Sequence, residues 1–97
     1  MSTITDAAIQ EYTDLYSSLD QTDKKWVVRE TVAAMRHLGT NELKDRVQAT
    51  ATRLKDLVES NEDTTIRPRS LVLHASLLRE YKLRLEEFEA ELRNGAA

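Results

Sequence analysis

Of the imidazole and thiolate ligands that transition metals favour, this sequence holds only two histidines, because it has no cysteine, so a metal centre would need an unusual carboxylate-dominated set. Neither His37 nor His74 has a second histidine at a ligand spacing, whereas such metal sites usually combine several nitrogen or sulfur ligands. His74 falls among apolar residues, where a half-buried histidine bonded to a neighbour is the ordinary arrangement. Its charge change near neutrality leaves a pH-sensitive contact as an alternative. We therefore expect no metal site.

The acidic residues near the C-terminus are numerous enough to suggest acid–base chemistry. They are Glu86, Glu87, Glu89 and Glu91. On a helix these positions point in several directions, which predicts a solvated acidic surface rather than two facing carboxylates. Hydrolytic triads need a nucleophile beside a base, and nucleotide-binding loops need several glycines, whereas the only glycines are Gly39 and Gly95. We expect a noncatalytic protein without a cofactor.

Length and composition indicate one small domain over residues 1–97. Two glycines, one proline and 32% charged residues are typical of a folded chain rich in helix formers. No apolar run approaches the ~18 residues of a membrane span, and residues 1–20 lack the basic start and apolar block of a signal peptide. We expect a cytoplasmic protein with no membrane segment.

Capping residues and periodicity predict the first two helices. Thr5 is the expected N-cap of a helix from about residue 6 to 18. Asp20 or Thr22 is expected to cap a second helix, with Gly39 as its left-handed C-terminal residue. The apolar positions expected along this second helix are Trp26, Val28, Val32, Met35 and Leu38.

Two further helices complete the predicted fold. Thr40 or Asn41 is expected to cap the third, which runs to about Val58, and Pro68 to begin the fourth, which ends near Gly95. Seam residues repeat three and four apart along the fourth helix: Leu71, His74, Leu78, Tyr81, Leu85, Phe88 and Leu92. The sequence thus predicts an all-α fold, a small helical bundle of three to four helices with a long heptad-patterned C-terminal helix. The first helix could instead be an arm on a three-helix core.

Charge along the fourth helix runs against the helix dipole. Its first part holds one acidic residue, Glu80, and five basic residues: Arg67, Arg69, Arg79, Lys82 and Arg84. Residues 85–97, by contrast, hold four glutamates and one arginine. Acids are favoured at helix N-termini and bases at C-termini, each by about 0.3–1 kcal/mol, so this distribution needs a compensating partner.

An antiparallel homodimer through the fourth helix would supply that partner, with Lys82 near Glu89 and Arg84 near Glu91 of the other copy. The alternative is that the seam packs inside its own monomer. Leu73 and Leu83 lie off the seam and could form a second contact surface. The predicted interface comprises Leu78, Tyr81, Lys82, Arg84, Leu85, Phe88, Glu89, Glu91 and Leu92.

A helix-turn-helix regulator that uses residues 27–58 is the alternative function. The stretch from Ala33 to Leu43 resembles that motif because a glycine-containing turn joins two helices. Its candidate phosphate contacts are Lys44, Arg46, Arg53 and Lys55. Acidic residues interrupt these four, and the net charge of the chain is −3, so nucleic acid is the less favoured partner.

The preferred interpretation is a protein-interaction module: an accessory, adaptor or inhibitor of a larger assembly that presents a helical face to a protein partner. The lack of a recognisable catalytic or metal-binding motif supports this interpretation more than any positive motif does. Trp26 and Tyr81 are candidate contact residues because aromatic side chains dominate interface energetics, although each also suits a core.

Overall fold

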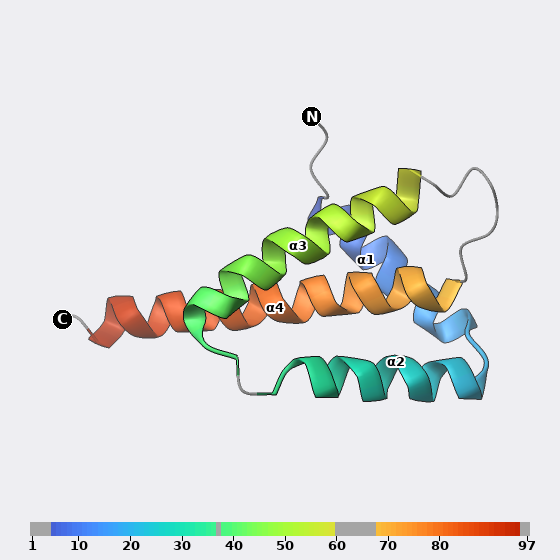
Figure 1. Cartoon of the computed structure of the whole chain (residues 1–97), viewed down its shortest axis with the longest axis horizontal. Helices are drawn as coiled ribbons and strands as arrows, with labels where there is room; N and C mark the ends of the chain where they lie inside the picture. The colour runs from blue at the N-terminus through green and yellow to red at the C-terminus, as the bar shows by residue number, and fades with distance from the viewer. Residues whose placement is uncertain (1–4, 37, 60–67, 96–97) are drawn as a thin grey trace.

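A computed structural model describes residues 5–36, 38–59 and 68–95 of the chain. The elements are α1 (Asp6–Asp14), the short 3-10 helix η1 (Leu15–Ser18), α2 (Gln21–Ala34), α3 (Thr40–Glu59) and α4 (Pro68–Gly95). The described residues contain helices and no strand, which confirms the predicted all-α bundle with a long C-terminal helix. In Figure 1, α4 runs through the middle of the molecule, between α3 and α2.

Helix α4 is the centre of the bundle because apolar residues surround it at its N-terminal end. Leu71, Val72 and Leu73 are consecutive, and their exposed fractions are only 8%, 0% and 8%. Consecutive helical residues point about 100° apart, so three buried neighbours require cover on several sides. Helices α1, α2 and α3 each pack on α4 and supply that cover. The expectation that Leu73 is exposed is therefore wrong.

Two apolar clusters hold the other helices to α4. In the first, Ile9 of α1 and Leu54 of α3 pack with Leu71, Ala75 and Leu78 of α4. In the second, Val27 of α2 packs with Val72 and Leu73, again on α4. Burying an aliphatic side chain contributes about 1.5–3 kcal/mol. Because Ile9 is 4% exposed, α1 belongs to the core rather than forming an arm.

The first two helix starts are fixed by short polar side chains. The Thr5 hydroxyl accepts a hydrogen bond from the Ala8 N–H at 3.1 Å, as the sequence predicts for its N-cap. Of the two candidate caps for α2, Asp20 fills the position, since its carboxylate accepts from the Asp23 N–H at 2.8 Å. An acid in the first turn of each helix, Asp6 and Asp23, complements the helix dipole.

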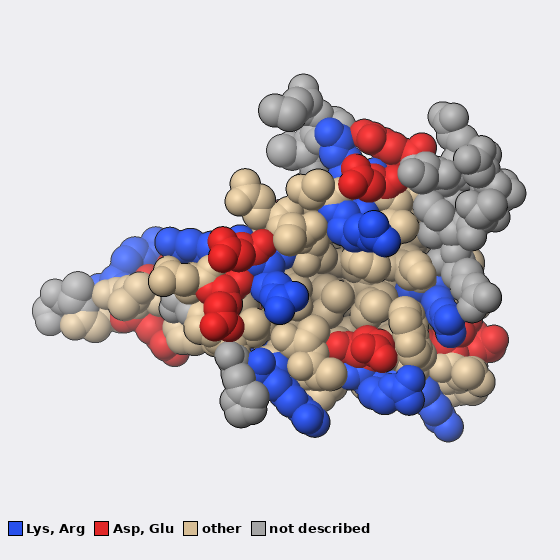
Figure 2. Space-filling view, viewed as in Figure 1, with Lys and Arg blue, Asp and Glu red and all other residues tan. Residues whose placement is uncertain are grey.

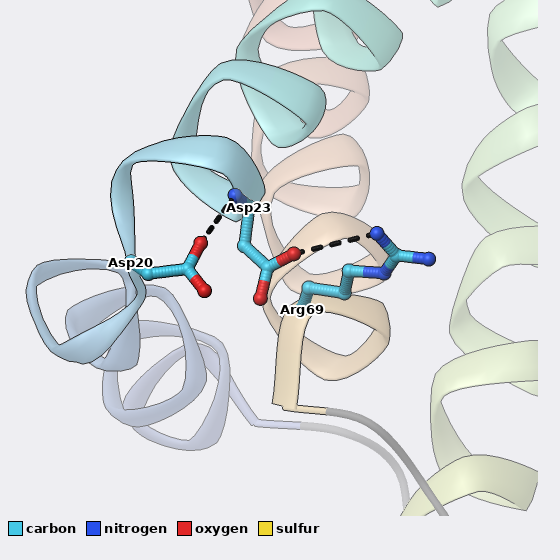
Figure 3. Close-up of polar contacts among 3 residues, drawn as sticks. All are labelled: Asp20, Asp23 and Arg69. Carbon is cyan, nitrogen blue, oxygen red and sulfur yellow. Dashed lines mark hydrogen bonds and ion pairs between the residues drawn. The ribbon is translucent and has the colours of Figure 1, made fainter.

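The beginnings of α2 and α4 are tied together by Arg69. Its guanidinium donates to the Asp23 carboxylate at 3.3 Å, beside the Asp20 cap (Figure 3). The same guanidinium lies over the Trp26 ring, 4.5 Å from the ring centroid. Trp26 is therefore engaged within the chain by a cation–π contact, at a half-buried position.

The prediction for Gly39 is wrong. Helix α2 ends at Ala34, where the Met35 N–H already bonds to nearby carbonyl groups in a tightened last turn, so Gly39 lies too far along to end it. The Gly39 carbonyl instead accepts the Leu43 N–H at 2.9 Å, which makes Gly39 the N-cap of α3. Its backbone does not adopt the left-handed conformation. Thr40 is the first helical residue, so neither Thr40 nor Asn41 is the cap.

The predicted apolar face of α2 is also wrong in part. Val28 and Val32 are 50% and 53% exposed, whereas Val27 is 3% exposed. Val27 is the residue that faces α4, and Val28 points about 100° away from it. Two large apolar side chains at helical spacing therefore lie on the solvent side of α2.

Candidate protein-interaction surface

The last turns of α4 extend beyond the helices that surround its beginning. The helix has 28 residues, about 42 Å at the normal helical rise, against 14 residues in α2 and 20 in α3. Figure 1 shows its C-terminal turns projecting from the bundle. We call residues 85–95 the α4 end. Because the beginning of the same helix is buried, the bundle anchors the α4 end.

The predicted apolar seam is divided between the core and this projection. Leu78 and Tyr81 are 2% and 3% exposed, so they belong to the core of their own chain. Leu85 and Phe88 are half-buried, and Leu92 is 66% exposed. The part of the predicted interface that a partner can reach is therefore the part after Tyr81.

Two basic residues of α4 pair with acidic residues of other helices. Lys82 donates to the Asp6 carboxylate at 2.7 Å, and Arg69 donates to Asp23 at 3.3 Å. Helices α1 and α2 thus supply part of the compensation that the reversed charge distribution of α4 requires. Arg79 is exposed, and Arg67 lies outside the described residues.

The charged residues at the predicted interface differ in whether they already form an ion pair within the chain. Arg84, Glu89 and Glu91 are exposed. Lys82 already contacts Asp6, whose side chain is 88% exposed, and such solvated pairs contribute little to stability. A partner that needs Lys82 must compete with that contact, whereas Arg84 and Glu91 are directly accessible.

The candidate phosphate contacts on α3 do not form one surface. Lys44 and Lys55 are three helical turns apart and share one flank. Arg46 follows Lys44 by about 200° around the helix and shares the opposite flank with Arg53. Lys55 also pairs with Glu59 at 3.8 Å. The four side chains therefore cannot together follow one phosphate backbone.

The geometry around α3 differs from a helix-turn-helix in a second way. Helices α2 and α3 each pack on α4, with at most marginal contact between the two. In Figure 1 they lie on opposite sides of α4. The exposed side chains of Asp45 and Asp56 lie between the two basic flanks, on the outermost part of α3, where they would repel phosphates.

His74 forms a hydrogen bond within its own helix. The His74 Nδ1–H donates to the Ser70 carbonyl one turn earlier, at 2.8 Å, which matches the half-buried, hydrogen-bonded histidine that the sequence suggests. His37 lies outside the described residues. Across residues 5–36, 38–59 and 68–95, no three His, Cys, Asp or Glu side chains are grouped as a metal site would need.

Sequence reasoning missed one exposed surface. Lys25, Val28, Arg29, Val32 and Arg36 are all exposed and recur three and four residues apart. We call these five residues the outer face of α2, although Arg36 lies in the turn just after the helix ends at Ala34. The spacing was visible in the sequence, but assigning Val28 and Val32 to the core concealed it. The α4 end and the outer face of α2 therefore both combine exposed apolar and charged side chains.

Comparisons with family models, curated proteins and solved structures found no match to this chain. None of the helices in the described part of the chain combines the length and apolar character needed to cross a membrane. What the fold and the surfaces define is a class: a small all-α bundle with one projecting helix.

Proposed function

We propose that this chain is a noncatalytic protein-interaction module that uses the α4 end to contact a protein partner. The observation that carries the proposal is Leu92, 66% exposed on a helix whose first half is core. In this proposal the chain acts in the cytoplasm as an accessory, adaptor or inhibitor of a larger assembly.

An anchored helical projection suits this function for an energetic reason. Ordering a flexible segment on binding costs free energy, and the α4 end is already helical before a partner arrives. Leu85, Phe88 and Leu92 are spaced three and four residues apart, the spacing by which a helix fills a groove on another protein. Flanking charges such as Arg84 and Glu91 would add specificity.

The antiparallel homodimer predicted from the sequence is a narrower form of this proposal. It would place two α4 helices in a coiled-coil-like contact, with Lys82 near Glu89 and Arg84 near Glu91. Two features weigh against it: Leu78 and Tyr81 are occupied by the core, and Lys82 already contacts Asp6.

Affinity capture from extracts of the source cells tests the proposal. The full chain is the bait, compared with Leu92→Ser and with a control, Leu15→Ser, which makes the same change at a 38% exposed site on η1. We expect one set of proteins to be retained by the wild type and by Leu15→Ser, and lost with Leu92→Ser. Equal retention by all three baits would contradict the proposal, provided that circular dichroism shows all three folded.

A further inference from the structure

The outer face of α2 is an apolar strip bordered by positive charge. Val28 and Val32 are 50% and 53% exposed and lie one turn apart. Lys25 and Arg29 flank them at helical spacing, and Arg36 is exposed in the turn that follows α2. Figure 2 shows Lys and Arg side chains along the edge of the molecule where Figure 1 places α2. Exposure of two adjacent valine side chains to water is unfavourable, and a contact that covered them would remove this unfavourable free energy.

The positive charge on this face is poorly balanced within the chain. An ion pair on this face joins Arg29 to Glu30 at 4.0 Å, between side chains that are 73% and 43% exposed. Among the described residues no ion pair involves Lys25 or Arg36. Asp23, the other acid of α2, is engaged with α4 instead. The face therefore favours an acidic ligand.

Beside this face a groove separates α2 from α4. It has a volume of about 480 Å3, and its lining combines apolar, basic and acidic side chains: Thr31, Val32, Met35, Arg36, Glu80 and Arg84. The two arginines outnumber the one glutamate in this lining. An apolar side chain that reached past Val32 would enter it, with Arg84 at its border. The face thus offers both a strip and a depression to an amphipathic helix.

The chain itself contains a segment with the opposite charge and the same spacing. Residues 85–95 hold four glutamates and one arginine, a net charge of −3 from four negative and one positive side chains. Phe88 and Leu92 lie one turn apart, as Val28 and Val32 do, and Glu91 is exposed beside them. We propose that a second copy of this chain occupies the outer face of α2: the α4 end of one copy docks on the outer face of α2 of another. This inference rests on the proposed use of the α4 end as a contact surface.

The arrangement of α2 and α4 allows this contact to be mutual. Asp23 meets Arg69 where both helices begin, and Val32 and Arg84 line one groove further along, so the two helices run in the same direction. In a two-fold dimer with opposed α4 helices, each α4 end can lie against the α2 of the other copy. Unlike the α4-to-α4 pairing, this contact depends on α2.

The apolar residues decide between a protein segment and nucleic acid as occupant. Phosphate contacts would use Lys25, Arg29 and Arg36 but would leave Val28 and Val32 uncovered. A helix with apolar residues and glutamates satisfies both parts of the face. Binding of duplex DNA through this face is therefore kept as an outcome that would overturn the proposal.

Analytical ultracentrifugation of the full chain, from tens to hundreds of micromolar, tests the docking by charge exchange. We expect the wild type to self-associate, and Arg29→Glu and Glu91→Arg each to weaken association about tenfold, since each sets like charges against one another. An equimolar mixture of the two variants, and the double variant, should regain most of the affinity because the reversed charges attract again. Arg53→Glu, the same change at an exposed site on α3, should leave association unchanged.

Three results would overturn this docking. The first is a monomer at every concentration, and the second is association that responds to Lys82→Glu or Glu89→Lys but not to Arg29→Glu. The third is salt-dependent binding of labelled duplex DNA that Arg29→Glu abolishes. If Leu92→Ser abolishes partner capture while the chain is monomeric, the proposed function stands and the self-docking fails. If the charge exchange restores self-association but Leu92→Ser does not reduce partner capture, the self-docking stands and the proposed contact with a different protein is wrong.

Discussion

Val27 and Val28 are neighbours in the chain but lie on different sides of α2: Val27 is 3% exposed against α4, and Val28 is 50% exposed to solvent. The 100° between consecutive helical residues separates them. The same rotation places Val32 and the cations on the solvent side, so the position of Val27 in the core determines which surface α2 presents.

This difference predicts unequal costs for the same substitution. Val27→Ala should lower the free energy of unfolding by about 2 kcal/mol, because it removes buried methyl groups and leaves a cavity. Val28→Ala should change it by less than about 0.5 kcal/mol, because the site is half exposed. Urea denaturation followed by circular dichroism measures both. Equal costs for the two variants would show that the assigned face of α2 is wrong.

Arg69 is predicted to stabilise the chain through its shape as well as its charge. Arg69→Lys keeps the positive charge beside Asp23 but loses the planar group over Trp26, so we expect a loss of about 0.5–1 kcal/mol. In a Trp26→Leu background the same substitution should cost nearly nothing, which a double-mutant cycle by chemical denaturation measures. A penalty of the same size in both backgrounds would exclude the stacking contribution.

Gly39 is predicted to be a site where a side chain stabilises the fold. An ideal Cβ there has no neighbouring atom within 4 Å, and Gly39 is the N-cap of α3. Gly39→Asp should raise the free energy of unfolding by about 0.5–1 kcal/mol, through capping and the helix dipole. Gly39→Ser, which caps without charge, should have a smaller effect of the same sign. Destabilisation by both would indicate a left-handed backbone after all.

Local signals in the sequence predicted the starts of α1, α2 and α4, although not the cap of α3. Thr5, Asp20 and Pro68 mark helix starts through short-range hydrogen bonding and a fixed proline backbone angle, which depend on little beyond neighbouring residues. The seam of α4 was likewise visible as a repeat. These features need no knowledge of how the helices pack.

Features that depend on packing were not predictable in the same way. Periodicity did not distinguish Val27 from Val28 as the buried residue, because choosing one requires knowing which side of α2 packs on α4. Periodicity also did not show that two residues of the same seam differ in exposure: Leu78 is 2% exposed and Leu92 is 66% exposed. This difference depends on where the helices that cover α4 end. The outer face of α2 was missed for the first reason.

We propose that this chain works through protein contacts and not through phosphate contacts from α3 or α2. The most direct measurement is binding of labelled random duplex DNA by fluorescence anisotropy, at low and physiological salt, with the full chain at up to tens of micromolar. We predict no saturable binding at either salt concentration, because the basic residues of α3 lie on two flanks and the net charge is −3. Salt-dependent binding lost in Arg46→Glu or Arg29→Glu would contradict the account and identify the chain as a nucleic-acid-binding protein.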